Sequence, residues 1–338
     1  MRDPLPAGED FTAFDRIRLD EHGTLLLNDG AGGDGDGGED RPVPVGRAGA
    51  LLETLVDLPP RTTDIFVFVH GWQTGRASAD AASRRLFSAI WRQYRERPER
   101  YPALEVFRPY CFSVQWPSRS LPTTAGYRRI RDRAHAMTSS GYAAHVIAAL
   151  LGRLDHVRES PRGPATLRTA GGQYLHCVGH SFGCRFLGEA IRQAADPPER
   201  VLAWPWASSH AYAVDTFLGL QMAAPADVFQ HRFRPLVDKS APIAGPVVLT
   251  VSPHDRALST WHRLPEGGPG LGAVGATGAR TIPLRPVEED YTAAQFEKLT
   301  NVDAQWVFRD GPVTQGAHSD IWYAETVHLL LSLAALAR

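Results

Sequence analysis

The pentapeptide Gly179-His180-Ser181-Phe182-Gly183 is the part of the sequence whose residue types point most directly to a chemical reaction. It follows the strand-like run 174–178 and precedes the helical pattern 184–191. A serine in a sharp turn between strand and helix has a strained backbone that exposes its hydroxyl, and small neighbours let the two elements approach closely. The pattern predicts a nucleophilic Ser181. The plainer interpretation is a glycine-rich turn in which the serine caps the helix.

A serine hydroxyl is a weak nucleophile until a base removes its proton, and that base must be oriented by a third group. The buried-strand pattern at 246–251 places Asp255 just past the end of a strand, where ligands gather in open α/β sheets. His318 lies in a loop before the last helical pattern. We therefore predict Asp255 as the orienting acid and His318 as the base. Helix capping is the alternative role for either residue.

Several other acids and histidines are rivals for these two roles. They are His254, His328, Asp303, Asp310 and Asp320. His254 adjoins the predicted acid, and His328 falls inside an amphipathic helical pattern, where packing is the simpler role. Asp303 and Asp310 do not directly follow a comparably strong apolar strand. Asp320 is expected to orient the loop after the base or to cap the closing helix.

Acyl transfer also needs backbone N–H groups that point at the oxyanion formed during the reaction. Phe182, the residue after the nucleophile, begins a helix. Gly71 follows the strongest strand pattern, 64–69, and lets the chain turn so that the Trp72 amide points towards Ser181. We predict the amides of Trp72 and Phe182 as the oxyanion hole. The alternative is a His-Gly pair that merely ends a strand.

The elements that must position these residues alternate between strands and helices, which predicts an α/β protein with a mostly parallel sheet covered by helices on both faces. Helices are expected at 79–95, at 127–158 with a break at 139–141, and at 321–337. Besides the strands named above, strands are expected at 105–114, 201–204 and 304–308.

The amino-terminal residues 1–47 are expected to form an extension to a main domain at 48–338. Strand-like runs at 16–19 and 24–27 flank the turn Glu21-His22-Gly23, which predicts a hairpin at the edge of the main domain. Residues 29–40 are almost entirely glycine and aspartate, a composition that predicts a flexible loop.

Composition and charge exclude several classes of protein. The 36 basic and 37 acidic residues give a formal net charge of −1, so no global field attracts nucleic acid or an anionic membrane. The three cysteines have no Cys-x-x-Cys spacing and indicate a reducing compartment. The sequence has no signal-peptide pattern and no apolar run of the roughly 20 residues that cross a bilayer. A cytoplasmic protein that binds no nucleic acid is expected.

Three segments together resemble a known superfamily. They are Phe66-Val-Phe-Val-His-Gly-Trp72, Phe112-Ser-Val-Gln-Trp-Pro-Ser118 and Gly316-Ala-His-Ser-Asp320. From about residue 60 onward the chain resembles the α/β-hydrolases, and within them a group of little-characterised bacterial serine-hydrolase-like proteins. The resemblance implies an eight-stranded, mostly parallel sheet with Ser181 as nucleophile, His318 as general base and Asp255 as acid. It implies Trp72 and Phe182 as amide donors and requires no metal or organic cofactor.

The chain departs from lipases with an extended His-Gly-Gly motif, because Trp72 and Gln73 follow Gly71. The apolar, aromatic-rich segment 202–222 is either the lining of an acyl pocket or ordinary core. The segment 266–279 has too many glycines for a stable helix and lies between the predicted acid and base, so it is interpreted as a mobile lid. The alternative is a phosphate-binding loop, although the segment lacks the Gly-Lys-Ser or Gly-Lys-Thr ending. The arginines at 128, 129, 131 and 133 are expected on a solvated surface, and Cys184 in the core.

The leading hypothesis is a serine hydrolase that cleaves a small-molecule or lipid-like carboxylic ester through an acyl-enzyme. A lipase or phospholipase, a peptidase and an acyltransferase are alternatives on the same three residues. A non-catalytic scaffold that uses the fold to bind a partner is the alternative from another class, and it has no need of nucleophile, acid and base in this order.

Overall fold

The structure is a computed structural model of the 338-residue chain. It describes residues 14–28, 40–59, 61–121, 123–158, 173–195, 212–238, 241–312 and 315–338. The glycine- and aspartate-rich run 29–39 and the expected strand 201–204 lie outside the described residues.

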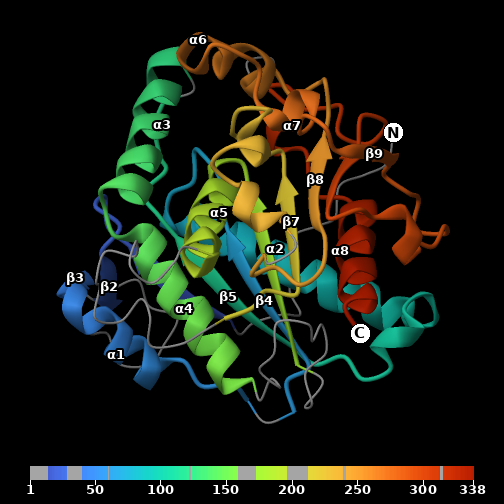
Figure 1. The fold of residues 1–338 in the computed structure, drawn as a ribbon, viewed down its shortest axis with the longest axis horizontal. Coiled ribbons are helices and arrows are strands. Elements are labelled where there is room, and N and C mark those ends of the chain that lie inside the picture. Colours follow the sequence, from blue (N-terminus) through green and yellow to red (C-terminus); the bar gives the residue numbers. More distant parts are fainter. Residues whose placement is uncertain are drawn as a thin grey trace.

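The strands of the described residues form one sheet of ten, in the order β3-β2-β1-β5-β4-β6-β7-β8-β10-β9. Figure 1 shows the central strands of this sheet. The eight neighbouring strands β1-β5-β4-β6-β7-β8-β10-β9 all pair in parallel. At the β1 edge, β2 pairs antiparallel with β1, and β3 pairs antiparallel with β2. The strands are β1 Asp15–Leu19, β2 Leu25–Asn28, β3 Asp40–Pro42, β4 Asp64–Val69, β5 Pro109–Gln115, β6 Tyr174–His180, β7 Thr216–Leu220, β8 Val247–Val251, β9 Arg280–Pro283 and β10 Leu299–Asp303.

Helices cover both faces of the sheet, as the alternating pattern predicts. The helices are α1 Val45–Leu55, α2 Arg76–Glu96, α3 Thr124–Ser139, α4 Ala143–Val157, α5 Phe182–Ala195, α6 Arg263–Glu266, α7 Leu271–Val274 and α8 Ala324–Leu336. Figure 1 shows α4 and α5 in front of the central strands β4 and β5. No described helix is long and apolar enough to span a membrane.

Each face of the sheet has its own apolar core, and the central strand β4 contributes to both. Ile65, Val67 and Val69 pack on the side of α1, α3, α4 and α5, whereas Phe66 and Phe68 pack on the side of α2 and α8. All six β4 residues are buried. A strand that is apolar on both faces is typical of the interior of a parallel sheet, which explains why this segment is the clearest strand in the sequence.

The α/β class and the alternation of elements are confirmed, and the predicted break at 139–141 separates α3 from α4. The described sheet has ten strands instead of the expected eight. The predicted strand at 304–308 is wrong: this segment is a turn, in which the amides of Val307 and Phe308 donate to the carbonyl of Ala304. The strand at this position is β10, five residues earlier, which pairs with both β8 and β9.

The predicted amino-terminal hairpin exists and belongs to the main sheet. β1 and β2 pair antiparallel, and Arg18 of β1 lies opposite Gln115 of β5 in a parallel register. Tyr110 of β5 also donates a hydrogen bond to Asp15 at 2.9 Å. The hairpin therefore extends the sheet at the β5 side.

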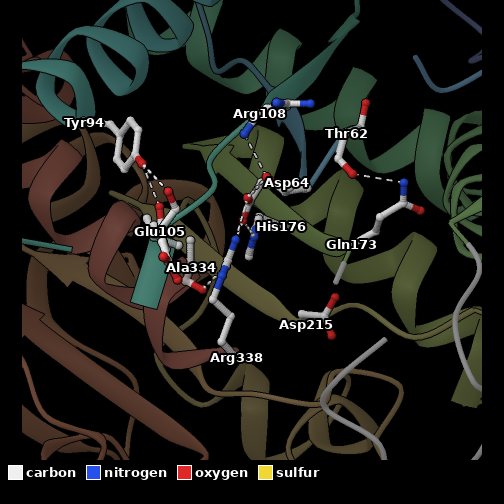
Figure 2. A network of polar contacts seen from close by, with 12 residues as sticks. Thr62, Asp64, Tyr94, Glu105, Arg108, Gln173, His176, Asp215, Ala334 and Arg338 are labelled. Carbon is white, nitrogen blue, oxygen red and sulfur yellow. Dashed lines mark hydrogen bonds and ion pairs between the residues drawn. The ribbon is translucent and has the colours of Figure 1, made fainter. Parts of the chain in front are cut away.

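A buried ionic network joins the amino end of β4 to the carboxyl end of α8 (Figure 2). Arg338 donates to both carboxylate oxygens of Asp64, at 3.1 and 2.7 Å. The Nε2 of His176 lies 3.1 Å from the same carboxylate, and the Thr63 hydroxyl donates to it at 2.7 Å. Burial alone would raise the pKa of Asp64, but the contacts with His176 and Arg338 outweigh it and hold the pKa below 3.8.

Asp64→Asn is expected to lower the free energy of unfolding by roughly 3 kcal/mol, because it removes the fully buried negative charge that both Arg338 and His176 contact. The pKa of Asp64 is lowered on folding, so its stabilisation is complete above pH 3.8 and is lost as the pH falls through the lowered value. Urea unfolding of both proteins at pH 7 and pH 3 measures the difference. Glu297→Gln is the control, since its pair with Arg280 is exposed and 4.0 Å long. Equal stability of Asp64→Asn and the wild type at pH 7 would contradict this account.

Candidate active site

Ser181 lies at the junction of β6 and α5, at the carboxyl edge of the sheet. Its backbone φ is 55°, a conformation that non-glycine residues rarely adopt. Its amide donates to Leu220 at the end of β7 at 2.9 Å, and its carbonyl accepts from Ala223 at 3.2 Å. A Cβ added to Gly183 would lie 2.1 Å from the Val69 carbonyl oxygen, so the close approach of α5 to β4 requires glycine there. The elbow geometry predicted from the pentapeptide is therefore present.

The structure brings together the three side chains that the sequence singles out. The Nε2 of His318 lies 2.8 Å from the Ser181 hydroxyl, and its Nδ1 lies 2.7 Å from a carboxylate oxygen of Asp255. When Nδ1–H donates to the carboxylate, Nε2 has its lone pair directed at the serine and can accept its proton. Such an arrangement is able to generate a serine alkoxide-like nucleophile.

Two further donors hold the Asp255 carboxylate in place. The Leu258 amide donates to Oδ1 at 2.9 Å, and Gln221 Nε2 donates to Oδ2 at 3.1 Å. Gln221 follows β7 and has a φ of 46°, so it is a second strained residue beside the site. The sequence analysis missed Gln221, since the type and spacing of a single glutamine give no signal of this contact.

Pairing between two loops places His318. Asp255 and Gly316 form an isolated antiparallel bridge. The His254 carbonyl accepts from the Ala317 amide at 3.0 Å, and the Gln315 carbonyl accepts from the Arg256 amide at 3.1 Å. The loop that follows β8 and the loop before α8 are thus joined directly beside the acid and the base.

The turn after β4 lies against the nucleophile. A Cβ added to Gly71 would be 2.8 Å from the Ser181 Cβ and 2.7 Å from the His180 Nδ1. The Trp72 amide has no hydrogen-bond acceptor among the described residues, and neither does the Phe182 amide, which is the first of α5. Free amides on the two chain segments nearest the serine are what an oxyanion hole requires.

The segment after β5 holds this turn in shape. The Trp116 amide donates to His70 Nε2 at 3.2 Å, and the Trp116 indole donates to the His70 carbonyl at 2.8 Å. The Ser118 hydroxyl donates to the Gly71 carbonyl at 2.8 Å, and its carbonyl accepts from the Gln73 amide at 3.0 Å. These bonds give a structural reason why the segments 66–72 and 112–118 occur together.

Gly71→Ala is expected to lower kcat/KM for an ester by about 10²- to 10³-fold, because the added methyl group pushes the Trp72 amide away from the serine. Steady-state kinetics and the melting temperature of the variant measure the effect. Gly46→Ala is the matched control, since a Cβ at this exposed α1 position meets no atom within 4 Å. A Gly71→Ala protein with wild-type kinetics would show that this turn has no part in the reaction.

Two neighbouring histidines are neutral over the physiological pH range. Burial lowers the pKa of His70 to about 4 and that of His180, with a smaller contribution from nearby His318, to about 3. His180 Nε2 donates to the His318 carbonyl at 2.8 Å, which helps to fix the base. Neither histidine therefore adds a positive charge beside the serine near pH 7.

Aromatic side chains from four segments form a cluster at the turn after β4 and the start of α5. The ring of Tyr127, from α3, lies 5.3 Å from Trp72 and 5.4 Å from Phe182 between ring centres. Trp261, at the end of the π-helix η5 Ala257–Trp261, lies 5.4 Å from Trp72. Ser181 is fully buried and His318 is 2% exposed.

The rival acids and histidines lie in other roles. His328 packs in α8 between the Tyr101 hydroxyl and the Glu289 carbonyl. Asp320 accepts the amides of Arg309 and Asp310 and so orients a loop, while α8 begins only at residue 324. The side chain of Asp303 accepts from the amide and the side chain of Gln305. Cys184 is fully buried, as expected.

The interpretation of 266–279 as a mobile lid is not supported. The amides of Leu271, Gly272 and Thr277 donate to carbonyls of the segment that follows β7. Leu271 and Gly272 are buried in α7. This segment is therefore tied to the sheet. Of the candidate acyl-pocket segment 202–222, residues 202–211 lie outside the described residues, and 216–220 form β7.

No protein-family model and no curated protein matches the chain. Among the described residues, no group of three His, Cys, Asp or Glu side chains is placed to hold a metal ion.

Proposed function

We propose that this protein is a serine hydrolase of the α/β-hydrolase type that cleaves carboxylic esters through an acyl-enzyme. The observation that supports the proposal best is the hydrogen-bonded series Ser181–His318–Asp255, in which the serine has a φ of 55°. Chance packing rarely places a strained serine, a histidine and a buried carboxylate in this order.

The reaction follows from the roles of these groups. His318 Nε2 takes the hydroxyl proton as Ser181 Oγ attacks the ester carbonyl, and the oxyanion accepts hydrogen bonds from the Trp72 and Phe182 amides. Collapse breaks the bond to the leaving alcohol, which receives the proton from His318. Water, deprotonated by the same histidine, then attacks the acyl-enzyme carbonyl. The bond to Ser181 Oγ breaks, His318 returns the proton to this oxygen, and the carboxylic acid is released. Asp255 stabilises the positive charge on His318 in both halves.

The three cysteines of the chain are free and buried, which suits a reducing compartment, and we place the reaction in the cytoplasm on that ground.

A series of p-nitrophenyl esters from acetate to palmitate, with and without an added alcohol acceptor, tests the proposal. Saturable release of p-nitrophenol supports a hydrolase, and the acyl length with the highest kcat/KM separates an esterase from a lipase. An alkyl ester formed with the acceptor in place of free acid identifies an acyltransferase. Absence of turnover with every ester would favour a non-catalytic scaffold.

A further inference from the structure

A cavity of about 460 Å³ lies at the same edge of the sheet as Ser181, at the carboxyl ends of β1 and β5. Its wall includes four arginines, which come from the hairpin, the start of α2, the segment after β5, and α3. They are Arg18, Arg76, Arg119 and Arg133. A cavity of this volume accommodates a small organic molecule, and the carboxyl edge of a parallel sheet is where such molecules bind.

The cations in this wall outnumber the carboxylates that neutralise them. Arg18 and Arg76 share one partner, Asp40, at 3.5 and 2.5 Å. Among the described residues, no carboxylate pairs with Arg119 or Arg133, and Arg133 donates to the Pro117 carbonyl at 2.7 Å.

The wall also contains two acids, Asp20 and Glu21. The Asp20 carboxylate accepts the amides of His22 and Thr24, and the Glu21 side chain is 66% exposed. The excess of positive charge therefore favours an anionic ligand.

Two other groups in the wall lack partners of their own. The 21-residue helix α2 begins beside the cavity with Gly75 as its N-cap, no side-chain cap and no acid in its first turn, so its first amides and positive dipole end are uncompensated. Gln115 is 4% exposed, and its buried Oε1 has no hydrogen-bond partner, whereas its Nε2 donates to Asp80 at 2.6 Å. An anionic group of a ligand would satisfy the helix end, and a donor group on the same ligand would satisfy the Gln115 oxygen.

The cavity adjoins the turn that lies on the nucleophile. His70 and Trp116 form part of its wall, and the hydrogen bonds between them hold the turn at Gly71. Leu19 and Leu26 add apolar surface. An occupant with an apolar body and a charged end would contact the guanidinium groups and the back of this turn together.

We propose that this cavity is a binding site for a small organic anion, a carboxylate or phosphate attached to an apolar body. The anion contacts Arg119, Arg133 and the first turn of α2, while the apolar body lies against Trp116. This inference does not depend on the proposed hydrolase activity, because none of its contacts involves Ser181, His318 or Asp255.

Calorimetric titration of the full chain with phenyl phosphate, benzoate and benzyl alcohol at low salt tests the site. We expect saturable binding of at least one of the two anions, and the tighter of them identifies the charged group. The affinity should fall as salt is added, and benzyl alcohol should bind much more weakly.

Arg119→Ala and Arg119→Ala/Arg133→Ala are expected to weaken anion binding by about tenfold or more, since each removes a charge-assisted contact. Arg128→Ala/Arg129→Ala is the matched control, because it removes the same charge from exposed α3 positions outside the cavity wall. Arg119 is exposed, so the single variant should fold even if the Arg133 contact with Pro117 matters for stability. Equal binding of benzyl alcohol and the anions, an equal loss in the control, or no saturable binding would overturn the proposal.

Discussion

Replacing Ser181 by alanine is expected to lower kcat for ester hydrolysis by about 10⁵-fold, because it removes the hydroxyl that His318 contacts and can deprotonate. The backbone at this position keeps its strained φ, and the change removes only one buried hydroxyl, so the fold should persist. Steady-state kinetics of purified protein with the ester found best for the wild type measure the loss.

Ser78→Ala, on the exposed surface of α2, is the control for the serine-to-alanine change. Residual activity of Ser181→Ala within tenfold of the wild type, with circular dichroism unchanged, would assign the reaction to another group. A variant that fails to fold is distinguished by its lost thermal transition.

Asp255→Asn is expected to lower kcat by about 10⁴-fold, because three neighbouring groups donate hydrogen bonds to the Asp255 carboxylate and an amide cannot accept all of them. Leu258 N–H points at Oδ1, whereas Gln221 and His318 both point at Oδ2. An asparagine has one oxygen, so its NH₂ group must face at least one donor. If it faces His318, Nδ1 must give up its proton, and the proton on Nε2 then prevents removal of the serine proton.

Asp303→Asn provides the matched control. For this rival acid at the end of β10, the structure gives one side-chain contact, with Gln305. Kinetics of both variants at pH 7, with melting temperatures, separate catalysis from stability. If Asp303→Asn lost more activity than Asp255→Asn, the assignment of the acid would be wrong.

The local features of the fold were predictable from sequence where one segment determines its own environment. The run 64–69 is apolar on both faces and becomes β4 with the same bounds. The serine elbow is also local, because the glycines and the switch from strand to helix occur within a few residues. The acid and the histidine were expected to follow the nucleophile in that order along the chain, which left few candidate residues for either role.

The features that were missed depend on distant partners. β10 reads Leu-Thr-Asn-Val-Asp, and its polar Thr300 and Asn301 are buried between β8 and β9, which a single segment does not reveal. The more apolar segment 304–308 forms a turn instead of a strand. The contact of Gln221 with Asp255 and the packing of Trp261 against Trp72 and Tyr127 likewise arise only when separate elements pack together.

The same reasoning applies to the arginines of α3. The sequence analysis expected all of them on a solvated surface, and Arg128 and Arg129 are exposed. Arg133 instead lines the cavity beside the hairpin, because β1 pairs with β5 and so brings residues 18–26 next to α3. A pairing of strands more than ninety residues apart gives no local signal.

Intact-mass analysis after treatment with a fluorophosphonate probe tests the central claim most directly, because the probe reacts with a serine only when a base activates it. The account predicts a single adduct on the wild type, none on Ser181→Ala, and much slower labelling of His318→Ala. An unlabelled wild type, or an adduct that persists when Ser181 is replaced, would contradict it.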